Sequence, residues 1–122
     1  MTGRVRFDDH LGRRILVTDL SNLDPDHTPE VLDEARRVVA TLPRERSLLS
    51  LLVVRNMRFD PKTIDAMKKV GRDNEPWVIA TAVVGLSAIG RVLARVVSTF
   101  SGRRYAAFET VDQAKEWLAR QS

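Results

Sequence analysis

The sequence predicts an α/β domain built on a mostly parallel sheet. Two nearly continuous apolar runs, residues 48–54 and 77–84, are typical of strands that are covered on both faces. Segments with helical spacing of apolar residues lie before, between and after these runs, and two of them open on a capping residue followed by proline. Buried strands that alternate with helices in this way favour a parallel sheet with helices packed on it.

The N-terminal part of the chain is expected to add a hairpin to this sheet. Residues 4–7 and 15–20 are short runs of β type. The segment between them holds the turn-forming residues Asp8, Asp9 and Gly12. We therefore expect two strands joined by a loose loop, which form an antiparallel edge of the sheet.

The first two helices follow this hairpin. Thr28 is expected to be the N-cap of the first, with Pro29 at its first position, where the missing N–H is harmless. Pro43 is expected to end that helix, because proline cannot continue the hydrogen-bond ladder. Asp60 and Pro61 repeat the signal of a cap followed by proline and open the second helix.

Two further helices are expected in the C-terminal half. Gly85 turns the chain from the second buried strand into a helix over residues 86–101. A short strand over residues 105–108 follows it. Thr110 and Gln113 then fit a capping box that opens the last helix.

Length and composition limit the classes of protein to be considered. The 122 residues are enough for one domain with a substantial core. The absence of Cys excludes a disulfide framework, a thiolate zinc site and a Cys nucleophile. The net charge of +4 comes entirely from the second half of the chain. The basic residues form no long block and no stripe interleaved with aromatic residues, so we expect a solvated surface and no nucleic-acid partner.

Neither a signal peptide nor a membrane span is expected. The basic residues near the N-terminus are not followed by an apolar segment. The longest apolar stretch, residues 77–90, is too short to span a bilayer, and Arg91 and Arg95 follow it. The sequence therefore favours a cytoplasmic protein, which fits the lack of Cys.

The turn at Gly85 resembles two functional motifs but lacks a decisive group of each. Gly85 and Gly90 have the spacing of a phosphate-binding loop, yet Arg91 stands where that loop needs lysine. Ile89 replaces the second glycine of a nucleophile elbow. A tight turn with Ser87 as the helix cap is the favoured interpretation.

Catalytic and metal sites are not expected. His10 and His27 each lie beside carboxylates in the sequence, but a metal site needs three or four ligands that converge. Both histidines are far in sequence from Ser87, so a triad has no sequence support. We expect a protein that is not an enzyme, with no catalytic residues, metal or cofactor.

The loop after the first buried strand is the main candidate for binding. In open parallel sheets, ligands and partners dock at the carboxyl ends of the strands. The loop carries Asn56 and Arg58 as polar residues, and Met57 and Phe59 suit a partner surface where they are exposed. Phe59 equally suits a hydrophobic staple, the favoured alternative, because it directly precedes the cap Asp60.

The helix expected over residues 87–101 is the second candidate. Its apolar stripe is expected to face the core, although its width also suits a dimer contact or a lipid-like ligand. Its basic side, with Arg91, Arg95, Arg103 and Arg104, suits an acidic lipid surface.

Several segments together resemble a known family. They are Ile-Leu-Val-Thr-Asp-Leu (15–20), Leu-Leu-Val-Val-Arg-Asn-Met-Arg-Phe-Asp-Pro (51–61), Asn-Glu-Pro-Trp-Val-Ile-Ala-Thr-Ala-Val-Val-Gly-Leu (74–86), Phe-Ser-Gly-Arg (100–103) and Glu-Trp-Leu (116–118). In this order they resemble the small bacterial SpoIIAA-like proteins of the STAS superfamily (sulfate transporter and anti-sigma-factor antagonist), which are sometimes grouped with CRAL-TRIO lipid-transfer domains. The resemblance covers about residues 12–119. It implies a single STAS-like domain over residues 1–122, with a mixed sheet and about four helices mainly on one face.

The resemblance also bears on the second helix start. In anti-sigma-factor antagonists, an Asp-Ser-Ser/Thr-Gly segment opens this helix, and a partner kinase phosphorylates a serine there. Here Asp60 matches, Pro61 and Lys62 cannot accept phosphate, and Thr63 is a hydroxyl out of register. The phosphorylation switch is therefore not carried over to this chain.

Together these observations predict a non-catalytic STAS-like domain that binds a protein. The candidate surface joins the starts of two helices: Asn56, Met57, Arg58, Asp60, Thr63, Ser87, Arg91 and Arg95. The alternative is a small carrier of a lipid or anionic ligand at membrane surfaces, which would use the helix over residues 87–101 and its arginines. A homodimer is also expected, because small compact domains often self-associate.

Overall fold

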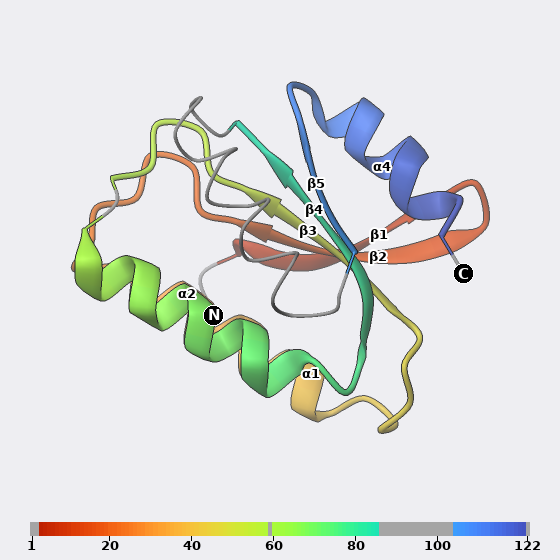
Figure 1. Ribbon diagram of the computed structural model, residues 1–122, viewed down its shortest axis with the longest axis horizontal. Coiled ribbons are helices and arrows are strands. Elements are labelled where there is room, and N and C mark those ends of the chain that lie inside the picture. Colours follow the sequence, from red (N-terminus) through yellow and green to blue (C-terminus); the bar gives the residue numbers. More distant parts are fainter. Residues whose placement is uncertain (1–2, 59, 86–103, 122) are drawn as a thin grey trace.

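The structure of the protein, a computed structural model, describes residues 3–58, 60–85 and 104–121 (Figure 1). In chain order, the elements are β1 (Val5–His10), β2 (Arg13–Asp19), α1 (Thr28–Ala40), β3 (Leu48–Val53), α2 (Pro61–Asn74), β4 (Val78–Val84), β5 (Arg104–Phe108) and α4 (Val111–Ala119). The helix expected over residues 86–101 lies outside the described residues. The described part of the chain therefore holds three of the about four helices that the sequence predicts.

The strands form one mixed sheet in the order β1-β2-β3-β4-β5. β1 runs antiparallel to β2, and every later pair of neighbours is parallel. The predicted mostly parallel sheet with an N-terminal hairpin at its edge is confirmed. Because β2 to β5 are parallel, their carboxyl ends meet at one end of the sheet, where the candidate loop over residues 54–60 begins.

The hairpin is tighter than the sequence predicts. β1 extends to His10 and β2 begins at Arg13, and these two residues face each other in the pairing register. Only Leu11 and Gly12 connect the strands, with φ angles of 49° and 75°. Two positive φ angles are the requirement of a type I′ turn, whose twist matches that of the strands. The predicted loose loop is wrong, because polar residues such as Asp8 belong to the strand and are paired by α4.

The start of α1 also differs from the prediction. Thr28 is fully buried inside the helix, and its hydroxyl donates a hydrogen bond to the Asp24 carbonyl oxygen at 2.8 Å. The N-cap is His27, which makes no side-chain capping bond. The helix ends at Ala40, before Pro43. Thr28 is thus not the cap, because the preceding turn already satisfies its hydroxyl.

The other two predicted caps are confirmed. The Asp60 carboxylate accepts a hydrogen bond from the Thr63 backbone N–H at 2.7 Å and opens α2. The Thr110 hydroxyl accepts one from the Gln113 backbone N–H at 3.2 Å and opens α4. Each bond satisfies one of the free N–H groups at a helix start.

Helices cover both faces of the sheet (Figure 1). α1 and α2 share one face, where Val31 and Leu32 of α1 and Met67 of α2 pack with side chains of the strand ends. α4 covers the opposite face. There, the fully buried Ala114 and Leu118 pack on alternate residues of the central strands, which are Ile15, Val17, Leu49, Leu51, Val53, Ala80, Ala82 and Val84. The buried strands are therefore apolar on both sides, as their continuous apolar sequences predict.

Polar contacts tie α4 to the N-terminal hairpin. The Lys115 ammonium lies 3.0 Å from the Asp8 carboxylate and holds the pKa of Asp8 below its usual value. His10 Nε2 lies 3.1 Å from the Glu116 carboxylate. The Arg13 guanidinium donates to carbonyl oxygens at the end of α4. α4 thus starts beside β5 at one edge of the sheet and is held by β1 and β2 at the other.

The tight turn gives a testable prediction. Leucine at a positive φ is strained, whereas asparagine adopts this conformation readily, and Asn-Gly is the preferred type I′ pair. We expect Leu11→Asn to raise the free energy of unfolding by about 1 kcal/mol, as measured by urea denaturation. Leu11→Ala is the matched control, because alanine keeps the strain and the leucine side chain is 68% exposed. An equal gain from both variants would contradict the turn assignment.

Candidate functional site

The candidate loop over residues 54–60 is held by backbone hydrogen bonds from both sides. The Val54 N–H donates to the Val84 carbonyl oxygen at 2.8 Å, which ties the loop to the end of β4. The Asn22 N–H donates to the Arg55 carbonyl oxygen at 2.9 Å, and the Arg58 N–H donates to the Leu23 carbonyl oxygen at 3.1 Å. The loop after β2 therefore supports the loop after β3, and its backbone is pre-organised.

Exposed and buried residues alternate in the loop around Asn56. Its φ of 54° lies in the left-handed region, which asparagine tolerates better than most residues. Asn56 and Arg58 are exposed at this end of the sheet. Met57 lies between them with only 8% of its surface exposed, and it packs in the core with Leu20 and Val54. The prediction that Met57 belongs to a partner surface is therefore wrong.

The start of α2 contributes one accessible carboxylate and one inaccessible hydroxyl. Asp60 is partly exposed, and its contact with Thr63 holds the pKa of Asp60 below its usual value. Thr63 is 1% exposed, and its hydroxyl has no hydrogen-bond partner among the described residues. Thr63 is thus part of the packed helix start, and its predicted place on the partner surface is wrong.

Several predicted residues lie outside the described part of the chain. They are Phe59, Ser87, Arg91 and Arg95, together with the whole helix expected over residues 86–101. Their roles in a partner surface or in binding a lipid stay predictions, as does the proposed staple at Phe59.

Arg55 is a residue of this region that the sequence did not single out. Its guanidinium donates to the Glu109 carbonyl oxygen at 2.9 Å, so the side chain reaches from the end of β3 to the end of β5. On the way it crosses Gly85, at the end of β4. A Cβ atom there would lie 2.4 Å from Arg55 Cγ and 3.0 Å from Arg55 Cα. The sequence signal was Gly85 itself, since a glycine directly after a buried strand often marks close approach of another segment.

His27 and Asp24 form a local pair beside this loop. His27 Nδ1 lies 2.7 Å from the Asp24 carboxylate, which also accepts the His27 backbone N–H at 3.0 Å. The hydrogen bond from the imidazole raises the pKa of His27 and lowers that of Asp24. The pair belongs to the turn that precedes α1.

The two histidines do not meet. His10 lies on β1 beside Glu116 of α4, whereas His27 precedes α1 and pairs with Asp24. Within residues 3–58, 60–85 and 104–121, no three His, Asp or Glu side chains are grouped so that they could hold a metal ion. Each histidine thus has a separate carboxylate partner.

Comparison with known proteins identifies the fold. No protein-family profile matches the sequence, and neither does any curated protein. A solved structure does match, with a TM-score of 0.75 over 93% of this chain and 91% of the other. It is that of an uncharacterised protein of the DUF3478 family with a SpoIIAA-like fold, from Shewanella loihica PV-4. The fold is SpoIIAA-like.

The resemblance predicted from the sequence is therefore confirmed at the level of the fold. The identity between the two chains is 14%, and one fold serves many functions, so the SpoIIAA-like fold by itself assigns no activity. Of the helices that the structure describes, none is both long enough and apolar enough to cross a membrane.

Because Arg55 lies so close to Gly85, we predict that adding one methyl group at Gly85 strongly lowers the stability of the fold. We expect Gly85→Ala to lower the free energy of unfolding by about 3 kcal/mol, because alanine adds both a strained φ and a clash with Arg55. Gly12→Ala is the matched control, since Gly12 also has a positive φ but a Cβ atom there meets no atom within 4 Å. For this control we expect the free energy of unfolding, measured by urea denaturation, to fall by about 1 kcal/mol. Equal losses would show that the clash is absent.

The His27–Asp24 pair predicts a measurable titration. We expect the pKa of His27, followed by NMR of its ring protons, to lie above the usual 6.5 and to return toward it in Asp24→Asn. Because the pKa is raised on folding, the pair stabilises the fold below pH 6.5, and this contribution is lost as the pH rises through the folded-state pKa. Asp26→Asn is the control, and we expect it to lower the pKa of His27 by less than Asp24→Asn does. An unchanged pKa in Asp24→Asn would contradict the pairing.

Proposed function

We propose that this SpoIIAA-like domain is a non-catalytic protein-interaction module whose partner docks on the loop over residues 54–60. The observation that carries the proposal is the pre-organised, exposed display of Asn56 and Arg58 by a backbone that is hydrogen-bonded on both sides. A rigid loop loses little conformational freedom on binding, which favours affinity. The carboxyl ends of parallel strands are also the usual place for docking in such sheets.

The chemistry of the loop favours an acidic partner surface. Arg58 is exposed, and its guanidinium suits charge-assisted hydrogen bonds to carboxylates. The exposed Asn56 side chain adds an amide NH₂ with two donors and a carbonyl oxygen acceptor to the same loop. Asp60 is engaged with the α2 backbone through Thr63, so its carboxylate is already partly satisfied.

The proposed absence of catalysis rests on the limited set of reactive groups. The chain has no Cys and two histidines, and each histidine is paired with a carboxylate in a different part of the fold. A general base with its own carboxylate still needs a neighbouring nucleophile. Ser87, which the sequence analysis considered for that role, is far in sequence from both histidines.

The proposed interaction does not depend on phosphorylation of the α2 start. Pro61 and Lys62 occupy the positions where anti-sigma-factor antagonists carry the modified serine. Thr63 is buried, which keeps its hydroxyl away from a kinase. We therefore propose a constitutive interaction, in the cytoplasm, through the exposed residues of the loop.

A capture experiment tests this proposal. The immobilised domain is incubated with an extract of its source organism, and the captured proteins are quantified by mass spectrometry. We expect Arg58→Glu to lower the yield of the specific partner about tenfold, because charge reversal places like charges across the contact. Arg120→Glu is the matched control, since Arg120 is exposed at the end of α4, where its side chain pairs with Glu116 and lies away from the loop.

The captured partner is then purified and its Kd is measured for the same variants. A Kd that Arg58→Glu leaves unchanged, or that Arg120→Glu changes equally, would contradict docking on this loop. Thermal unfolding of each variant confirms that the fold is intact.

A further inference from the structure

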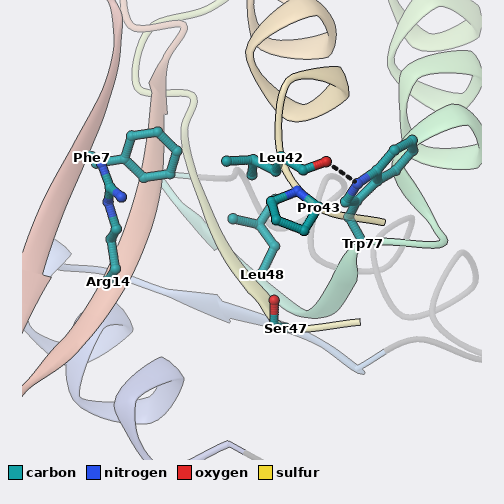
Figure 2. A pocket seen from close by; sticks show the side chains of 7 residues that line it. All are labelled: Phe7, Arg14, Leu42, Pro43, Ser47, Leu48 and Trp77. Atoms are coloured by element: carbon teal, nitrogen blue, oxygen red, sulfur yellow. Dashed lines mark hydrogen bonds between the residues drawn. The ribbon is translucent and has the colours of Figure 1, made fainter. Parts of the chain in front are cut away.

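A small pocket lies at the end of the sheet opposite to the loop over residues 54–60. Its volume is about 150 Å³, and it opens between the hairpin, the end of α1 and the starts of β3 and β4. Figure 2 shows Phe7 and Arg14 on one side and Leu42, Pro43 and Trp77 on the other. Ser47 and Leu48 lie between the two sides.

Most of the lining of this pocket is apolar, and hydrogen bonds hold it in place. The Trp77 indole N–H donates to the Leu42 carbonyl oxygen at 3.3 Å (Figure 2), which fixes the orientation of the ring. The Trp77 carbonyl oxygen accepts the backbone N–H groups of Ser47 at 3.1 Å and Leu48 at 2.8 Å. These bonds join the segments before β3 and β4, so the pocket does not depend on a loose loop.

One charged group stands at the wall. The Arg14 guanidinium lies 4.0 Å from the centre of the Phe7 ring, in the geometry of a cation–π contact. Within the described part of the chain, Arg14 makes no salt bridge, and no carboxylate lines the pocket. A guanidinium stacked on a ring keeps its planar N–H edges available for a carboxylate.

A second arginine adds to the positive charge near the pocket. The Arg44 guanidinium lies 5.7 Å from the centre of the Trp77 ring. Two acidic residues adjoin these arginines: Asp9 faces Arg14 in the hairpin register, and Glu45 follows Arg44 in the sequence. Both are exposed and neither lines the pocket.

We propose that this pocket binds a small aromatic carboxylate with a single ring. A pocket of about 150 Å³ is large enough for one benzene ring, and Phe7, Leu42, Leu48 and Trp77 supply most of its apolar lining. The ring stacks between the aromatic and aliphatic walls, and its carboxylate pairs with the Arg14 guanidinium at the mouth. The proposal goes beyond the proposed protein interaction, because it uses none of the residues of the loop over residues 54–60.

Benzoate is the probe that tests this proposal. Backbone amide shifts of the ¹⁵N-labelled protein report where it binds. Trp77 fluorescence reports its affinity in a Trp117→Phe background, since the chain has two tryptophans and Trp117, on α4, packs on Phe108 of β5. We expect shifts centred on Phe7, Ser47 and Trp77, and a Kd on the order of 1–10 mM for so small a ligand.

Substitution of the arginine distinguishes the proposed site from weak general binding. Arg14→Gln keeps a polar side chain and removes the charge, and we expect it to weaken benzoate binding about fivefold. Arg120→Gln removes one exposed charge from the opposite face and is expected to leave the Kd unchanged. Toluene lacks the carboxylate of benzoate. We therefore expect neither variant to change the Kd of toluene.

Three results would overturn the proposal. The first is the absence of shifts at about 100 mM benzoate, roughly ten times the upper end of the expected Kd range. The second is a set of shifts that maps away from the pocket. The third is a benzoate Kd that Arg14→Gln does not change, which would show an apolar pocket without selectivity for an anion. Because the loop over residues 54–60 is untouched, these results do not bear on the proposed protein interaction.

Discussion

The fold depends on the cover that α4 gives to one face of the sheet. Successive residues of a strand point to opposite faces, so β3 and β4 carry apolar side chains on both. α1 and α2 can bury only one of these faces. On the other, Leu51 and Ala82 are fully buried because Ala114 and Leu118 lie over them. Since full burial of a large apolar side chain contributes about 2 kcal/mol, the sheet would be unstable without this helix.

The two proposed binding regions lie at opposite ends of the strands. At the carboxyl end, the loops after β2 and β3 hold each other, and Arg55 crosses Gly85 to the end of β5. At the amino end, Trp77 joins the segments that lead into β3 and β4. The two proposed binding regions are therefore built on the same rigid strands but share no residues, so each can change without loss of the other.

The sequence predicts most of this fold because its main signals are local. The runs over residues 48–54 and 77–84 are apolar on both faces, and the caps Asp60 and Thr110 bond to their own helices. The hairpin was mispredicted because Asp8 resembles a turn residue until its partner Lys115, 107 positions away, is known. No local pattern shows such a pair.

The candidate site was predicted less well, for the same reason. The exposure of Asn56 and Arg58 follows from the position of their loop after a buried strand. Met57 lies in the same loop, but the positive φ of Asn56 and the packing of Val54 decide that it is buried. Backbone angles and tertiary packing of this kind are not encoded in the polarity of single residues, and neither is the path of Arg55 across Gly85.

The distance in sequence between Asp8 and Lys115 also has a consequence for synthesis of the protein. The first strand leaves the ribosome long before the helix that covers the sheet, since translation adds roughly 5–20 residues per second. During that interval of several seconds, one apolar side of β2, β3 and β4 has no cover from α4. Because the sheet is unstable without α4, these apolar strand segments stay without their native cover until α4 has left the ribosome, which is the stage at which chaperones would protect the chain and at which it is most exposed to aggregation.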